Sequence, residues 1–117
     1  MKTSSRKAKG RNLQNEVVKI LMNRFEYDLK EGDIKPAIMG ESGVDIKLSP
    51  LAKCYIGYDI ECKNQEKLNI WSALKQCEEN SEVERIPLLI FKRNRSDIYC
   101  CLKFRDLIKL DKGTVVS

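Results

Sequence analysis

Apolar residues recur at helical spacing in two stretches of the chain, and these stretches predict its main helices. The first helix is expected over residues 10–26, and the second over 70–81 after Asn69, because Asn is favoured at the position just before a helix. A shorter helix or turn is expected over 103–110. The apolar residues of the three segments are, in order, Leu13, Val17, Ile20, Leu21 and Phe25; Ile70, Trp71, Leu74 and Cys77; and Phe104, Leu107 and Ile108.

Strict alternation of apolar and polar residues predicts two strands in the middle of the chain. Residues 44–48 alternate around Asp45, and residues 54–63 alternate over their whole length. We expect the second strand to return antiparallel to the first after a turn at 49–53. Strand 54–63 then has a core face and a wet face, made respectively of Ile56, Tyr58, Ile60 and Cys62, and of Tyr55, Gly57, Asp59, Glu61 and Lys63.

Three further segments complete the predicted sheet. Residues 35–39 form a short strand that Pro36 limits at its start. The continuous apolar run 86–91 predicts a strand buried on both faces, and 98–102 is its hairpin partner. The resulting order, α β β β α β β α, predicts an α/β fold with a mixed central sheet flanked by helices.

Size and composition favour a single globular domain. The chain has 117 residues, of which 42% are hydrophobic, and no apolar stretch approaches the roughly 20 residues that span a bilayer. Because segment 1–11 also lacks the apolar core of a secretory signal, we expect a cytoplasmic protein. The absence of histidine excludes His-based catalytic triads and His-ligated zinc. The cysteines lack the paired spacing of zinc ligands and are expected to be buried apolar residues: Cys54, Cys62, Cys77, Cys100 and Cys101.

The positive charge of the chain is concentrated at its start. Residues 1–11 contain five positive charges and no negative one, which equals the net charge of +5 for the whole chain. We therefore divide the chain into a flexible basic arm, 1–11, and a single domain, 12–117. Such an arm suits sequence-independent contact with nucleic-acid phosphates, and the alternative is a solubilising tail. The basic residues of the arm are Lys2, Arg6, Lys7, Lys9 and Arg11.

Asp45, Glu61 and Lys63 form the most informative pattern of polar residues. A hard divalent cation such as Mg²⁺ binds carboxylate oxygens, and hydrolysis of a phosphodiester needs the extra negative charge neutralised while a water attacks. Glu61 and Lys63 emerge on the same face of their strand, so one strand supplies both a metal ligand and a lysine that orients the water. Asp59, one step along the same face, is interpreted as a solvated residue or one that supports the ligands.

Two other groups of residues are candidates for the same chemistry. Glu16 lies at the edge of the apolar stripe of the first helix, where it is either a third, outer metal ligand or a surface residue that pairs with Lys19. Lys92, Arg93 and Arg95 form either a second patch that contacts phosphates or an ordinary exposed hairpin turn.

Over residues 10–102 these features resemble the PD-(D/E)xK nuclease superfamily. By position, Asp45 matches the first acid of the motif, and Glu61 and Lys63 match its (D/E)xK; Val44 stands where the superfamily's name has proline. The resemblance implies a restriction-endonuclease-like αβββαβ core. It also implies roles for three residues outside the motif: the helical acid Glu16, the polar residue Gln76 on the helix that follows the motif strand, and Ser42, similar to the loop serine of archaeal Holliday-junction resolvases.

Within the superfamily, the chain is most similar to small Holliday-junction resolvases. That resemblance implies a homodimeric endonuclease that cuts branched DNA with Mg²⁺, Mn²⁺ being the alternative metal. Two other functions stay open. One is another small nuclease of the superfamily, of the VRR, restriction or repair type, and the other is a non-catalytic nucleic-acid-binding module with a vestigial site.

Overall fold

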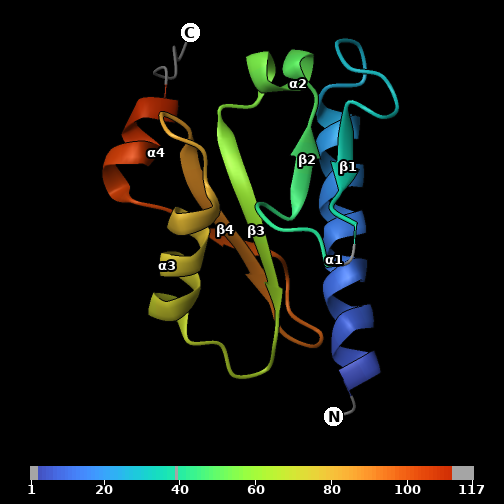
Figure 1. Cartoon of the computed structure of the whole chain (residues 1–117), viewed down its shortest axis with the longest axis vertical. Helices are drawn as coiled ribbons and strands as arrows, with labels where there is room; N and C mark the ends of the chain where they lie inside the picture. The colour runs from blue at the N-terminus through green and yellow to red at the C-terminus, as the bar shows by residue number, and fades with distance from the viewer. Residues whose placement is uncertain (1–2, 39, 112–117) are drawn as a thin grey trace, which may run out of the picture.

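The fold is described from a computed structural model, which describes residues 3–38 and 40–111. A long helix, α1 (Thr3–Arg24), runs along one side of the molecule, and a three-stranded sheet with α3 (Ile70–Asn80) and α4 (Phe104–Leu110) forms the other side (Figure 1). The lower end of α1 in this view projects beyond the sheet. The molecule is accordingly elongated, measuring 49 × 31 × 30 Å.

The strands form two small sheets. β1 (Ile34–Pro36) pairs antiparallel with β2 (Ile46–Leu48). β3 (Tyr58–Asn64) pairs parallel with β4 (Ile86–Lys92), which pairs antiparallel with β5 (Tyr99–Cys101). The sheet of β3, β4 and β5 is therefore mixed, and helices flank it. This confirms the predicted α/β class, and the arrangement is compatible with a restriction-endonuclease-like core. The expected antiparallel pairing of β2 with β3 is wrong, because the two strands belong to separate sheets.

Helix α1 begins earlier than its apolar stripe predicts. We expected its start at residues 10–12, whereas it begins at Thr3 and continues through Gly10. The predicted start is therefore wrong, because a Gly in a helix interior costs only about 1 kcal/mol relative to Ala and the neighbouring Lys, Arg and Ala residues favour a helix. Of the basic segment, Met1 and Lys2 lie outside the described residues.

The connection between β2 and β3 is a helix and not the expected turn. α2 (Pro50–Tyr55) begins after Ser49, whose hydroxyl oxygen accepts a hydrogen bond from the Ala52 amide at 3.1 Å. Proline at the first helical position suits this start, because its missing N–H would have no partner there. The predicted strand 54–63 therefore starts later, at Tyr58, and its first residues belong to α2 and its C-terminal cap.

The core lies on both faces of the β3–β4 pair. On one face, Leu13, Val17 and Leu21 of α1 pack in a single cluster with Ile60 and Leu88. On the other, Ala73 and Cys77 of α3 pack with Leu89. Because neighbouring residues of a strand point to opposite faces, burial of both Leu88 and Leu89 confirms that β4 is covered on both sides. The predicted N-cap of α3 is also confirmed, since Asn69 Oδ1 accepts from the Ser72 amide at 3.1 Å.

Some apolar residues of the predicted helices are exposed. Trp71 on α3 is 82% exposed and Phe104 on α4 is 76% exposed, so membership of an apolar stripe does not by itself place a residue in the core. Cys62 and Cys77 are buried as expected, whereas Cys54 and Cys100 are exposed.

Among the described residues, no helix is both long and apolar enough to cross a membrane.

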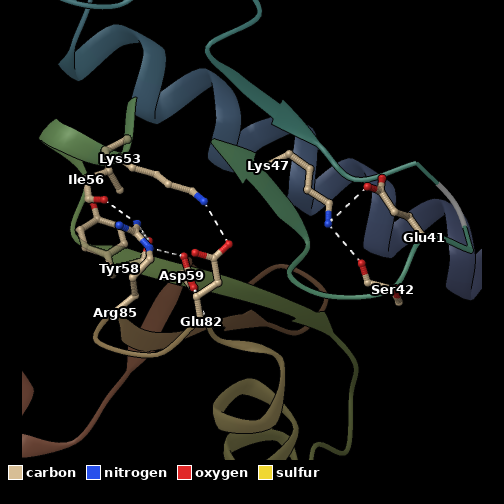
Figure 2. Close-up of polar contacts among 9 residues, drawn as sticks. All are labelled: Glu41, Ser42, Lys47, Lys53, Ile56, Tyr58, Asp59, Glu82 and Arg85. Atoms are coloured by element: carbon tan, nitrogen blue, oxygen red, sulfur yellow. Dashed lines mark hydrogen bonds and ion pairs between the residues drawn. The ribbon is translucent and has the colours of Figure 1, made fainter. Parts of the chain in front are cut away.

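Asp59 is buried and not solvated, which corrects its assignment to a wet face. Its side chain is 4% exposed and forms an ion pair with Arg85, at 2.6 Å between Oδ1 and Nε (Figure 2). The other carboxylate oxygen accepts from the Glu82 amide at 2.9 Å, and Arg85 Nη2 donates to the carbonyls of Ile56 and Tyr58. This network ties the segment after α3 to the start of β3 and has a structural role.

Candidate active site

Asp45 is placed by the loop that leads into β2. Gly40 and Gly43 have φ values of +84° and +95°, a conformation that side chains with a Cβ rarely adopt. After this loop, the Asp45 amide donates to the Ile60 carbonyl at 3.0 Å, and Asp45 Oδ2 accepts from the Cys62 amide at 2.7 Å. The sequence left the register between Asp45 and the motif strand open. These two hydrogen bonds set it, and they bring Asp45 beside Glu61.

Glu61 lies on the face of β3 that α3 covers, and only 3% of it is exposed. Asn80, the last residue of α3, donates its side-chain N–H to Glu61 Oε1 at 3.4 Å. The other oxygen, Oε2, is buried and has no hydrogen-bond partner. Glu61 and Asp45 are within hydrogen-bonding reach of each other's carboxyl groups. Glu61 of β3 and Asp45 of the loop before β2 therefore meet at the edge of a groove.

Burial raises the pKa values of both acids, and the charge of Asp45 raises that of Glu61 further. Desolvation is the main cause of the raised pKa of Asp45. Desolvation, followed by the negative charge of Asp45, raises the pKa of Glu61 to about 7. The positive charge of Lys63, half-buried on the same strand, acts in the opposite direction on both pKa values. Near neutral pH the two acids therefore tend to share one proton, unless another cation stabilises the doubly ionised form.

The donor set fits a divalent cation. Carboxylate oxygens are the ligands that Mg²⁺ and Mn²⁺ prefer, and the unpartnered Glu61 Oε2 is a buried acceptor that a cation would satisfy. A cation would also relieve the repulsion between the two acids. Within the described ranges, no group of three or more His, Cys, Asp or Glu side chains is arranged to hold a metal. The candidate centre is therefore the pair Asp45 and Glu61.

The other predicted site residues lie elsewhere. Glu16 is exposed and lines a groove that does not contain Asp45. Gln76 is exposed on α3. Ser42 is exposed in the loop before Asp45, and its carbonyl accepts from Lys47 Nζ at 3.1 Å, while Lys47 also pairs with Glu41 at 3.3 Å (Figure 2).

Two polar residues near the site were not identified from the sequence. No sequence pattern indicates that Asn80 lies near Glu61, because that contact depends on how α3 packs against β3. Gln14 lines the same groove as Asp45, and its position, three residues after Arg11 and seven after Lys7, could have shown that the three share a helix face. α1 thus presents Gln14, and not Glu16, to the groove that contains Asp45.

Two grooves flank the basic half of α1. One, of about 220 Å³, contains Asp45 together with Lys7, Arg11 and Gln14, and we call it the Asp45 groove. The other, of about 370 Å³, contains Lys9, Lys92 and Arg95, and we call it the Lys9 groove. Three residues of the predicted basic arm and two of the predicted hairpin patch thus line grooves in the folded domain. Arg6 and Arg93 are exposed outside both grooves.

Comparison with known families identifies the family of this chain. The sequence model of a family described as "Phage putative PDDEXK endonuclease" matches residues 5–115, which is nearly the whole chain. The chain belongs to this endonuclease family. Neither the curated proteins nor the solved structures contain a significant match. Membership of the PDDEXK endonuclease family indicates a nuclease, and a nuclease binds nucleic acid. Asp45, Glu61 and Lys63 are the residues that we matched to the PD-(D/E)xK motif.

The raised pKa of Glu61 predicts how stability depends on pH in the absence of metal. Between its ordinary pKa of 4.5 and about 7, Glu61 binds its proton more tightly in the folded chain than in the unfolded chain. Stability should therefore fall as pH rises through this window, by on the order of 3 kcal/mol for a shift of this size. Glu61→Gln should remove that loss, so in EDTA the variant should be more stable than wild type at pH 8 and similar to it at pH 5.

Urea unfolding at both pH values checks this prediction. Glu79→Gln, an exposed acid on α3, is the matched control and should follow wild type. If Glu61→Gln is less stable than wild type at pH 8, then Glu61 is held in its ionised form by the fold and the repulsion described above is absent.

Proposed function

We propose that this protein is a divalent-metal-dependent endodeoxyribonuclease with its active site at Asp45, Glu61 and Lys63. The observation that carries the proposal is the meeting of the buried carboxyl group of Glu61 and the half-buried one of Asp45, both with raised pKa values, beside a lysine in a chain of the PDDEXK endonuclease family. Perturbed acids that converge in this way are typical of catalytic sites. In Asp59, which has a structural role, both carboxylate oxygens instead have hydrogen-bond partners.

Asp45 and Glu61 would hold Mg²⁺ or Mn²⁺ through their carboxylate oxygens. The bound metal would supply Lewis-acid activation and neutralise charge on the scissile phosphate. Asn80 positions Glu61 by its hydrogen bond to Oε1, and the Cys62 amide positions Asp45. Lys63 orients the attacking water and stabilises the negative charge that develops on the phosphate in the transition state. Lys7 and Arg11 of the Asp45 groove would hold the DNA backbone next to the carboxylates.

We further propose that the substrate is branched DNA and that the active form is a homodimer. Support comes from the resemblance to junction resolvases in size, in the motif acids and in the exposed loop residue Ser42. Symmetric cutting of a four-way junction requires two active sites, hence two copies of the chain. The alternative is a small PD-(D/E)xK nuclease that acts on linear duplex DNA, for which the same carboxylate pair would serve.

Cleavage assays on defined DNA structures test the proposal. Purified protein is incubated with labelled four-way junction, flap, nicked and linear duplex DNA, in Mg²⁺, in Mn²⁺ or in EDTA. We expect cleavage only with metal, and paired symmetric cuts in the four-way junction. If linear duplex is cut as fast as the four-way junction, the protein is a nuclease without specificity for branched DNA. Binding to DNA without cleavage in either metal would favour the non-catalytic module.

Replacing Lys63 with Ala should reduce cleavage by about 10²-fold, a typical effect of removing one electrostatic stabiliser. DNA binding should change little, because the lysine acts mainly on the transition state. Single-turnover cleavage and binding in EDTA measure the two effects separately. Lys75→Ala, an exposed lysine on α3, is the control and should cleave like wild type. Equal cleavage rates for the two variants would show that Lys63 has no catalytic role.

A further inference from the structure

The N-terminal half of α1 presents cations to two different grooves. Lys7 and Arg11 line the Asp45 groove, whereas Lys9 lines the Lys9 groove together with Asn12 and Glu16. Residues three or four apart share one face of a helix, so the two sets point to different sides of α1. The helix is therefore a common wall, with a candidate active site on only one of its sides.

The opposite wall of the Lys9 groove comes from the ends of β3 and β4 and the turn that follows β4. Asn64 and Lys92 are the last residues of these two strands, and Asn94 and Arg95 belong to the turn. The walls are held together, because Asn64 Nδ2 donates to the Lys9 carbonyl at 3.2 Å. Asn64 Oδ1 is buried with no hydrogen-bond partner. The groove is therefore built by segments that are distant in sequence, and fixed by a hydrogen bond.

The cations of this groove lack partners within the part of the chain that the structure describes. Lys47, Lys53, Arg85, Lys103 and Lys109 each form an ion pair there. Lys9, Lys92 and Arg95 form none, and the single acid of the groove, Glu16, lies more than 4.0 Å from each of them. The groove thus has an excess positive charge that is available to an anion.

We propose that the Lys9 groove binds the sugar-phosphate backbone of a nucleic-acid strand outside the cleavage site. Three cations and three asparagine amides are the side chains that contact phosphates and sugars without reading bases. Because α1 separates this groove from the Asp45 groove, a strand held here is a different segment of DNA from the one at the carboxylates. The inference rests on the proposed nuclease function and adds a second contact region for its substrate.

Neutralising the far wall of the groove tests this inference without touching the active site. The variant is Lys92→Gln with Arg95→Gln, and the control is Lys75→Gln with Arg105→Gln, which removes the same charge from exposed positions on α3 and α4. Binding of labelled duplex is measured by anisotropy in EDTA over a range of salt concentrations. If both residues contact phosphates, the slope of log K against log salt should fall by about 2, at roughly 0.9 for each phosphate. The control should change it less.

A charge change of the opposite sign gives an independent check. Glu16→Gln removes the one acid of the groove and should tighten binding in EDTA, and melting temperatures verify that each variant is folded. Equal slopes for the groove variant and the control, or weaker binding by Glu16→Gln, would overturn the proposal. So would a mononucleotide that displaces the duplex at equal phosphate concentration, since it would indicate a site for small anions. Failure of wild type to cleave any DNA would instead count against the proposed function.

Discussion

Replacing Asp45 with Asn should reduce metal-dependent cleavage by about 10³-fold or more while leaving the protein folded. The amide oxygen of Asn can still accept the hydrogen bond from the Cys62 amide, so the local backbone is kept. The change removes one of two negative charges that would hold the metal, and with it the activation that the metal supplies to the phosphate. The rate is measured with excess enzyme in Mg²⁺, and folding is measured by thermal unfolding.

Two comparisons make the Asp45 result specific. Asp28→Asn changes an exposed acid after α1 and should cleave like wild type, whereas wild type in EDTA should be as inactive as Asp45→Asn. In EDTA the variant should also melt no lower than wild type, because it loses a repulsion with Glu61. If Asp45→Asn cleaves at the wild-type rate, or if it unfolds well below wild type, Asp45 is not a metal ligand and the proposed active site is wrong.

Replacing Arg85 with Ala should destabilise the protein by about 3–5 kcal/mol, the usual range when one partner of a buried ion pair is removed. The Arg85 side chain is 13% exposed and that of Asp59 is 4% exposed, so the variant leaves a buried carboxylate without its cation. It also removes the donor to the carbonyls of Ile56 and Tyr58. This loss is a large part of the stability of a small domain. Urea unfolding at pH 7 measures it.

An exposed ion pair nearby provides the control for Arg85. Lys53 pairs with Glu82 at 3.0 Å, but both side chains are well exposed, so Lys53→Ala should cost no more than about 1 kcal/mol. Adding Asp59→Asn to Arg85→Ala should recover part of the lost stability, because the unpaired charge is removed. Similar stability of the Lys53 and Arg85 variants would show that the buried pair contributes no more than the exposed one.

Most elements of the fold could be predicted from local patterns. Asn69 predicted the start of α3, and the run 86–91 predicted a strand covered on both faces, because capping and strand burial depend on residues close in sequence. α2 was missed although Ser49 and Pro50 carry a helix-start signal. The start of α1 was misplaced because Gly10 was interpreted as a boundary, yet a single Gly does not end a helix whose other residues favour it.

The sequence by itself determined the residues of the candidate site and the alternation that separates Glu61 from Ile60. Tertiary structure decided what each side of β3 faces. Alternation shows that Asp59 and Glu61 share a face, but not that α3 covers it, that Arg85 neutralises the first acid, or that the second keeps an unpartnered oxygen next to Asp45. Likewise, only packing brought Lys9 and Arg95 to the same groove. Contacts between residues far apart in the chain depend on how whole elements pack, and local patterns contain no information on that packing.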